Sequence, residues 1–389
     1  MSEVVTSVQA FTLTQSRDVP YLGAARPGET PNEKGYLVRL GNRTVYPIFD
    51  RSILVRVETN NGTVGWGETY GLVAPGAVGE LIKDLLADFT IGRDPTDPAA
   101  IYDDLYDLMR VRGYTGGFYV DALCAIDIAL WDIAGKIAKA PISTLLGGAQ
   151  HDRIPAYISG LPKETLAARV ALAQSWQARG FSAFKFATPV ADDGPAAEIA
   201  ALRAALGPEA QIAADLHWNQ TADTALGLIN AMAAHDLWFA EAPVRTEDIA
   251  ALAQVTASCD TPIAVGEEWR THFDMLHRIE RCKIAIVQPE MGHKGITNFM
   301  RIGQLAEAHG IDVIPHATIG AGIFLAASLQ ASSALKMTKF HEFQHSIFEP
   351  NRRLLIGDME CKEGYYTPPT GHGLGVALSQ AALDLLEPL

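Results

Sequence analysis

Short apolar runs alternate with longer amphipathic segments through the second half of the chain. Each run is rich in Ile, Val, Ala and aromatic residues and is bounded by loop residues, which is typical of buried parallel strands. The intervening segments are long enough for one helix each. The alternation predicts eight strands and seven crossover helices of a parallel (β/α) barrel, with strands near 154–160, 182–188, 211–215, 237–241, 261–267, 284–290, 311–316 and 340–345.

The first part of the chain follows a different pattern. Residues 4–14 alternate as a strand does, and 51–71 reads as a hairpin around Asn61-Gly62. Helical patterning follows from 75 to 140. We therefore expect an α+β capping domain over residues 1–148, a barrel over 149–349, and a tail over 350–389 that packs back on the capping domain.

A long polar stretch separates the first predicted strand from the hairpin. It runs from Ser16 to Asp50, and loops of this length in compact proteins are often functional lids. We expect this lid to close over the barrel mouth. The candidate substrate-binding residues are Lys34, Arg43 and Tyr46 in the lid, and Arg51 directly after it. The alternative is that each of them is an ordinary solvated loop residue.

Three acids end consecutive predicted strands. Asp215, Glu241 and Glu267 follow one another at equal intervals of 26 residues, which suits one strand, one helix and two loops. Their carboxylates should meet at the same barrel edge, where they repel one another unless a cation lies between them. Oxygen ligands of this kind suit Mg²⁺. The alternative is that each acid only caps the helix that follows it.

Further polar residues fall at the same predicted edge. These are Lys185, His217, Glu290, His316 and Glu342. A carboxylate on a neighbouring strand orients an imidazole and raises its basicity, so His316 and Glu290 form a candidate acid–base pair. Lys185 is open to three interpretations: a buried cation that balances acids, a group that polarises a substrate carboxylate, or a base with a depressed pKa.

Composition and charge narrow the class of protein. The chain has 389 residues, of which 48% are hydrophobic and 20% charged, as in ordinary globular proteins. The net charge of −14 argues against nucleic acid and anionic membranes as partners. The four cysteines are scattered, which indicates reduced thiols, and the N-terminal sequence lacks a secretion signal. We expect a cytoplasmic protein, and barrels of this type often form homo-oligomers.

A divalent ion beside a strong base suggests proton abstraction next to a carboxylate. The resulting enediolate requires stabilisation by the metal and by cationic donors. His316 or Lys185 would take the proton, and Glu342 would hydrogen-bond a substrate oxygen. If the neighbouring carbon carries a hydroxyl, His217 is the candidate acid that helps to expel it as water.

Several motifs resemble the mandelate racemase subgroup of the enolase superfamily. VRVETNNGTVGWGE, AIDIALWDIAGK and LLGG resemble its capping-domain motifs. The resemblance implies a modified (β/α)7β TIM barrel, one Mg²⁺ per subunit held by Asp215, Glu241 and Glu267, and a His–acid pair at His316 and Glu290.

The chain departs from this pattern at two positions. The Lys-x-Lys of the second strand is Lys185-Phe186-Ala187, and the usual Asp of the dyad is Glu290. Loss of the second lysine weakens the expectation of a racemase. The Asp215-Leu-His217 sequence resembles acid-sugar dehydratases, and the stretches FKFATPVADDGP, ADLHWNQT, QPEMGHKG and HEFQHSIFEPNRR resemble a branch associated with dehydration of galactarate. These resemblances imply dehydration of a polyhydroxy carboxylate. A racemase, epimerase or lactone cycloisomerase is one alternative, and a non-catalytic sugar-acid binding protein is another.

Overall fold

An antiparallel sheet forms one layer of the N-terminal domain. In the computed structural model, which describes residues 3–17, 23–316 and 320–389, its strand order is β18-β1-β4-β5. The strands are β1 (Val5–Ser16), β4 (Phe49–Thr59), β5 (Val64–Tyr70) and the C-terminal β18 (Leu386–Pro388). The β4–β5 hairpin turns where the Asn-Gly sequence predicts.

The N-terminal domain also contains helices, of which the first three and the longest contact the sheet. They are α1 (Pro75–Leu81), η1 (Ile82–Leu86), α2 (Ala87–Thr90), α3 (Pro98–Arg110), α4 (Gly117–Ala138) and α5 (Ile142–Leu145). Helix α4 is buried along most of its length and lies directly on β5. A Cβ atom at Gly67 would stand 1.7 Å from the carbonyl oxygen of Ala125, so the close approach of α4 requires glycine there.

In the part of the chain that the structure describes, eight parallel strands form the barrel, in the spatial order β13-β6-β7-β8-β9-β10-β11-β12. The ring closes between β12 and the segment that leads into β13. There, Val313 N donates to Met337 O and Lys339 N donates to Val313 O. The strands are β6 (Ile154–Ser159), β7 (Ala183–Ala187), β8 (Gln211–Asp215), β9 (Leu237–Glu241), β10 (Ile263–Val265), β11 (Ile286–Val287), β12 (Asp312–Val313) and β13 (His341–Phe343).

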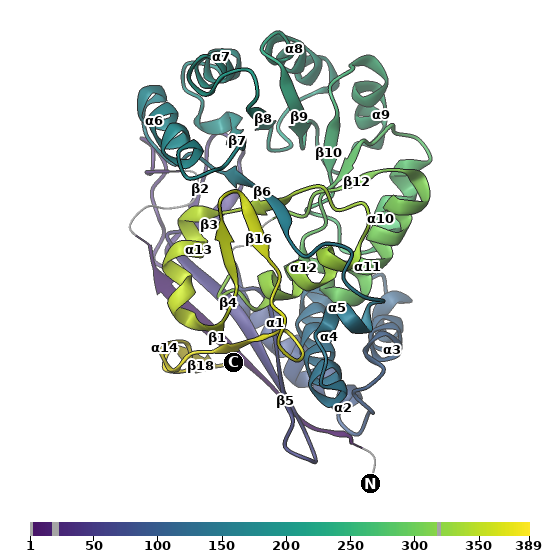
Figure 1. Ribbon diagram of the computed structural model, residues 1–389. Coiled ribbons are helices and arrows are strands. Elements are labelled where there is room, and N and C mark those ends of the chain that lie inside the picture. The colour runs from purple at the N-terminus through teal and green to yellow at the C-terminus, as the bar shows by residue number, and fades with distance from the viewer. Residues whose placement is uncertain (1–2, 18–22, 317–319) are drawn as a thin grey trace.

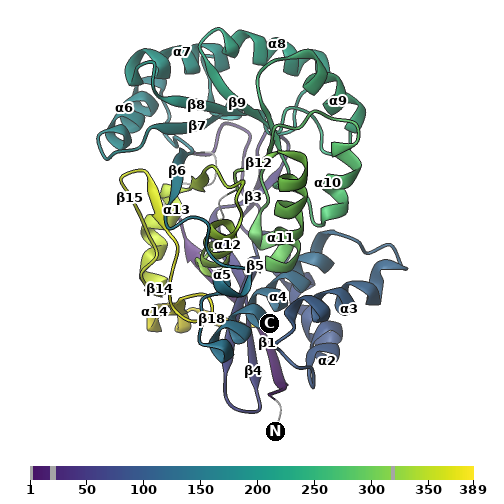
Figure 2. The ribbon, with the colours of Figure 1, turned by 45° about the vertical axis from the view of Figure 1, so that its right-hand side comes forward.

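The crossover helices surround the strands (Figure 1). They are α6 (Leu166–Gln177), α7 (Pro195–Leu206), α8 (Ala222–Ala233), α9 (Ile249–Ser258), α10 (His272–Ile279), α11 (Met291–His309) and α12 (Ile323–Ala334), with a short η2 (Thr188–Val190) after β7. Figure 2 shows α11 and α12 on the side of the barrel that faces the N-terminal domain. The predicted capping domain and barrel are confirmed.

Strands β11 and β12 are only two residues long, where the apolar runs predicted strands near 284–290 and 311–316. β11 covers Ile286–Val287, and β12 covers Asp312–Val313. Single ladder bonds continue beyond them, from Gln288 N to Val265 O and from Ile314 N to Val287 O. The backbone then leaves the ladder, which places the following side chains at the barrel mouth.

The predicted lid contains a small hairpin of β2 (Tyr36–Val38) and β3 (Val45–Pro47). Two contacts tie the lid to barrel loops: Asn219 Nδ2 donates to Gly41 O at 2.6 Å, and Arg26 pairs with Asp192 at 2.7 Å. Residues 18–22 of the predicted lid lie outside the described residues.

The C-terminal tail contacts the capping domain, where we expected it to pack, and it also contacts the barrel. β18 pairs with β1, while β16 pairs with β6 of the barrel. Buried Tyr366 and Cys361 explain the second contact, because they extend the barrel's apolar core. Helix α13 (His345–Asn351) joins the last barrel strand to the tail, whose other elements are η3 (Arg352–Leu354), β14 (Leu355–Gly357), β15 (Glu360–Lys362), β17 (Val376–Leu378) and α14 (Gln380–Leu383).

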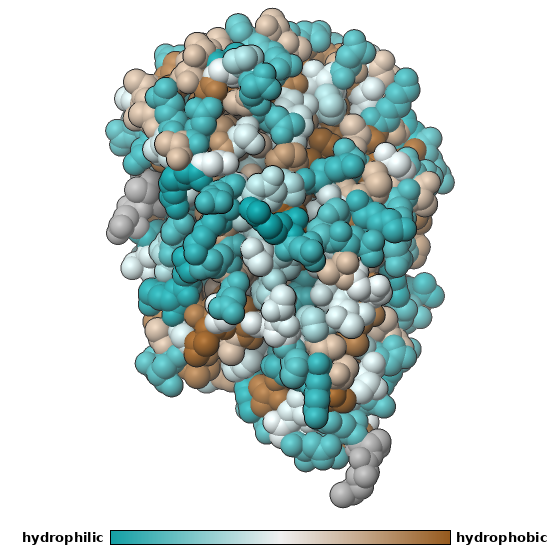
Figure 3. All heavy atoms as spheres, viewed as in Figure 1, coloured by the Kyte–Doolittle hydropathy of each residue, from teal (hydrophilic) through white to brown (hydrophobic). Residues whose placement is uncertain are grey.

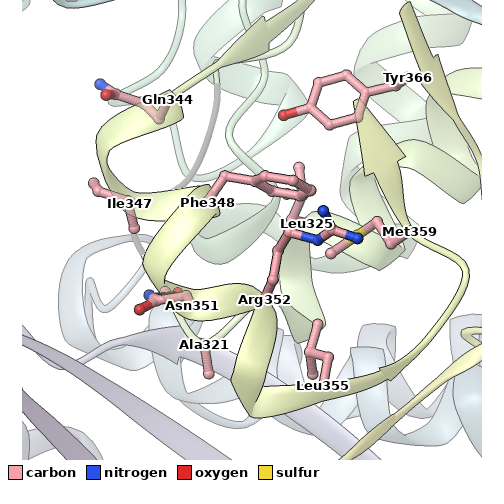
Figure 4. A pocket seen from close by; sticks show the side chains of 12 residues that line it. Ala321, Leu325, Gln344, Ile347, Phe348, Asn351, Arg352, Leu355, Met359 and Tyr366 are labelled. Carbon is pink, nitrogen blue, oxygen red and sulfur yellow. Dashed lines mark hydrogen bonds between the residues drawn. The ribbon is translucent and has the colours of Figure 1, made fainter. Parts of the chain in front are cut away.

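A small cavity of about 20 Å³ lies beneath the tail, where Leu325, Phe348, Met359 and Tyr366 converge (Figure 4). Its apolar lining and water-sized volume suit a packing defect rather than a reaction site. The face of the molecule seen in Figure 3 is mainly polar, with apolar residues in small separate patches. No helix among the described residues is long and apolar enough to cross a membrane.

Candidate active site

A cavity of about 470 Å³ opens where the barrel strands end, beneath the lid. Residues of the barrel, the lid and the N-terminal domain share its lining. Nine of the site residues that the sequence predicts line it or contact side chains that do: Tyr46, Lys185, Asp215, His217, Glu241, Glu267, Glu290, His316 and Glu342.

Lys185 lies at the base of this cavity as a buried cation. Its Nζ atom is 2.7 Å from each carboxylate oxygen of Glu241 and 3.1 Å from Oε1 of Glu342. Burial alone lowers the pKa of Lys185, but the two carboxylates outweigh it and raise the pKa well above its ordinary value. These contacts favour the cation interpretation of Lys185 over that of a base with a depressed pKa.

Asp215 and His217 form a local pair at the end of β8. The backbone N–H of His217 donates to Oδ1 of Asp215 at 2.8 Å, and Nδ1 of His217 lies 2.9 Å from Oδ2. His217 and Trp218 both have φ of 52°, in the left-handed region that such residues rarely adopt. Strain of this kind concentrates at functional sites, and here it turns the His217 side chain into the cavity.

His316 and Glu290, which the sequence predicts to be an acid–base pair, are in hydrogen-bond contact. Nδ1 of His316 lies 2.6 Å from Oε2 of Glu290. The glutamate, one methylene longer than the aspartate of the family pattern, therefore still contacts the imidazole. The other oxygen of Glu290 accepts the backbone N–H of Gly292 at 2.8 Å and caps α11. Burial lowers the pKa of His316, but Glu267, Glu342 and Glu290 raise it to about 10.

The chemistry of the three strand-end acids fits a hard divalent cation. Burial raises the pKa of Glu267 well above its ordinary value, and the charges of Glu241 and Asp215 raise it further while His316 opposes them. A cation between the carboxylates would offset this repulsion. Among the described residues, no three His, Cys, Asp or Glu side chains already stand at metal-binding spacing. Lys185 holds Glu241, and His217 holds Asp215.

The lid residues differ in their placement. Tyr46 lines the cavity, and burial raises its pKa to about 12, with Glu267 and Asp215 as further causes. Lys34 is exposed on the lid and does not line the cavity. Arg51 donates to Gly71 O and to the hydroxyl of Tyr36, which places it beneath the lid. Binding of substrate by Tyr46 and Lys34 stays a prediction.

Sequence reasoning missed how one face of α4 holds the turn after Glu290. Cys124 Sγ contacts the carbonyl oxygen of Met291 at 3.1 Å, and Asp127 accepts from the N–H of Thr297 at 3.0 Å and from its hydroxyl at 2.6 Å. Thr69 of β5 donates to the carbonyl oxygen of Gly292 at 2.6 Å. The three-residue spacing of the acids and cysteine on α4 was a usable signal, since such positions share a helix face.

Sequence reasoning also missed Gln288, Asp121, Arg270 and His293. Gln288 Nε2 donates to Oε2 of Glu241 at 2.6 Å and fixes that carboxylate beside Lys185. Asp121, Arg270 and His293 line the cavity on the side of the N-terminal domain. Their side chains meet only in the folded protein, because they come from α4, the loop before α10, and α11.

Comparison with known proteins agrees with this arrangement. Residues 168–382 match the family described as "Enolase C-terminal domain-like". Residues 48–147 match "Mandelate racemase / muconate lactonizing enzyme, N-terminal domain".

Individual relatives cover nearly the whole chain. A D-galactarolactone cycloisomerase of Agrobacterium fabrum is 33% identical over 86% of this chain and 91% of its own length. A D-galactonate dehydratase of Ralstonia nicotianae is 31% identical over 88% of this chain and 93% of its own.

A solved structure is closer still. The crystal structure of a member of the enolase superfamily from Agrobacterium tumefaciens is 71% identical, covers 100% of both chains, and superposes with a TM-score of 0.98. The barrel, its capping domain and these matches together show that the chain belongs to the enolase superfamily.

Proposed function

We propose that the protein is a Mg²⁺-dependent acid-sugar dehydratase that acts on galactarate or a related hexarate. One observation carries the proposal: two imidazoles face the same cavity, and each is held by a carboxylate, His316 by Glu290 and His217 by Asp215. Elimination of water from a hydroxy acid needs a base for the α proton and an acid for the leaving hydroxyl. Two oriented imidazoles supply this pair of groups.

Asp215, Glu241 and Glu267 would hold the cation, which supplies charge stabilisation to the substrate carboxylate as the α proton is lost. His316 takes that proton at Nε2, since Nδ1 faces Glu290. The negative charge of Glu267 contributes to the raised pKa of His316, which is about 10. A cation bound to Glu267 would offset that charge and lower the pKa of His316, so that Nε2 could accept a proton.

The remaining groups bind and complete the reaction. Lys185 supports the substrate carboxylate from beside Glu241, and Glu342 hydrogen-bonds a substrate oxygen. His217 donates a proton to the departing hydroxyl, and the resulting enol tautomerises to a 2-keto-3-deoxy sugar acid. Tyr46, with the lid closed over the mouth, limits the access of bulk water.

The curated relatives favour one second candidate. Because a D-galactarolactone cycloisomerase is 33% identical to this chain, ring opening of a sugar-acid lactone is the alternative reaction. It uses the same proton abstraction but expels a ring oxygen instead of water.

The two candidates separate in one experiment. The protein is incubated with Mg²⁺ in D₂O with galactarate, galactonate or D-galactarolactone, and the products are read by proton NMR. A 3-deoxy-2-keto acid from an open-chain acid supports the dehydratase, whereas product from the lactone alone supports the cycloisomerase. Asp215→Asn, Glu241→Gln, Glu267→Gln and excess chelator should each abolish the product. Normal turnover in these samples would contradict the proposal.

A further inference from the structure

A third imidazole–carboxylate pair lines the cavity, on the side of the N-terminal domain. Nδ1 of His293 is 2.8 Å from Oδ1 of Asp121, and Nε of Arg270 is 2.8 Å from the same oxygen. Burial raises the pKa of Asp121, but His293 and Arg270 outweigh it and hold the pKa below its ordinary value. Asp121 is therefore ionised and can only accept hydrogen bonds. Nδ1 of His293 must carry the proton, and Nε2 is left with its lone pair.

The His293 imidazole is neutral as well as oriented. Burial, and then the charge of Arg270, lower its pKa to about 4. At neutral pH its Nε2 atom is thus a hydrogen-bond acceptor and not a donor. No described residue forms a hydrogen bond with Nε2, while the His293 side chain lines the cavity and remains 19% exposed.

The N-terminal domain fixes the plane of this imidazole. Tyr70 of β5 stacks on it, with ring centroids 4.3 Å apart and an interplanar angle of 26°. A Cβ atom at Gly292 would lie 2.9 Å from the Tyr70 ring, so the glycine permits this stack. Together with the contacts of α4 to Met291 and Thr297, the stack leaves the His293 side chain little freedom.

From this geometry we propose that His293 is a specificity-determining residue whose Nε2 atom accepts a hydrogen bond from a substrate hydroxyl. This inference rests on the proposed function, because it concerns the same cavity. A fixed, neutral acceptor forms a hydrogen bond with a hydroxyl group and gains nothing from a methylene group. The site therefore selects polyhydroxylated acids over unsubstituted acids of the same length.

Binding can be measured without turnover in a His316→Asn background with Mg²⁺. Calorimetry compares galactarate with adipate, a six-carbon diacid that lacks hydroxyls, in chains with and without His293→Phe. Phenylalanine keeps the ring that stacks on Tyr70 but removes both nitrogens. We expect galactarate binding to weaken by about 3- to 10-fold and adipate binding to change less than twofold. Equal weakening of both ligands, no weakening, or no binding of galactarate would overturn the inference.

A second measurement requires no His293 variant. Nitrogen NMR of the folded protein should show the Nε2 of His293 unprotonated at pH 7, with a shift when galactarate binds and none with adipate. A protonated Nε2, or equal shifts, would count against the assignment. The two proposals can fail separately. If galactarate binds more tightly than adipate in a His293-dependent way, but the wild-type protein forms no keto acid, the dehydratase proposal is wrong and the role of His293 is retained.

Discussion

Nδ1 of His316 lies 2.6 Å from Oε2 of Glu290, at a position where the family pattern implies the shorter aspartate. The glutamate reaches because its backbone stands at the start of α11, where its other oxygen caps the helix. The extra methylene is therefore part of the geometry that orients the imidazole.

Shortening this side chain should separate the pair. We expect Glu290→Asp to slow exchange of the substrate α proton, and Glu290→Gln to slow it by about 100-fold or more, because an amide cannot stabilise the imidazolium as a carboxylate does. Proton NMR in D₂O measures the exchange. Wild-type exchange in Glu290→Asp would show that the shorter acid serves equally well.

The kink at Gly295 in α11 should tolerate no side chain. Its φ is 67°, and a Cβ atom there would stand 2.5 Å from Oδ2 of Asp127. Gly295→Ala should lower the free energy of unfolding by more than about 1 kcal/mol. The control is Gly227→Ala in exposed α8, where no atom lies within 4 Å and a gain of about 0.5 to 1 kcal/mol is expected. Urea unfolding distinguishes the two, and equal effects would contradict the prediction.

Buried His341 should make the protein less stable in mild acid. Nε2 contacts the Ser328 hydroxyl at 2.8 Å, and burial lowers the pKa of His341 to about 4. Between about pH 6.5 and 4 the unfolded chain binds a proton that the folded chain does not. The free energy of unfolding should therefore fall as the pH falls through this window, by up to about 1.4 kcal/mol per unit from this group.

His341→Gln should flatten that dependence, since glutamine does not titrate. Urea unfolding at several pH values measures the slope. The matched control is His309→Gln at an exposed position, which should leave the slope unchanged. A wild-type slope in His341→Gln would assign the acid sensitivity to other groups.

The lid should open more readily without its link to the barrel. Asn219→Ala removes the 2.6 Å hydrogen bond to the carbonyl oxygen of Gly41. We expect faster limited proteolysis within the lid and a KM raised by about 3- to 10-fold, with a smaller change in kcat. Asn230→Ala, on the exposed face of α8, controls for loss of an asparagine. Unchanged proteolysis in Asn219→Ala would show that this contact does not hold the lid.

The sequence predicted what depends on periodicity. Equal spacing placed Asp215, Glu241 and Glu267 at one barrel edge because each repeat contains one strand and one helix. The pairing of His316 with Glu290 followed from the same phase. Both predictions depend only on the spacing between consecutive barrel strands, so they required no knowledge of the N-terminal domain.

Contacts between the domains were beyond the reach of that argument. Asp121 and Asp127 read as ordinary positions of an apolar helix until α4 is packed against the turn after Glu290. The position of Lys34 was also beyond that argument, because the path of the lid, and not its composition, decides which side chains reach the cavity.

The contacts between α4 and residues 291–297 have a consequence for recombination between related proteins. A chimera with its capping domain from one parent and its barrel from another would separate Cys124 and Asp127 from the turn they hold. The dyad carboxylate at the start of that turn would lose its support even with every barrel residue retained. A functional chimera should therefore require that α4 and residues 291–297 come from the same parent.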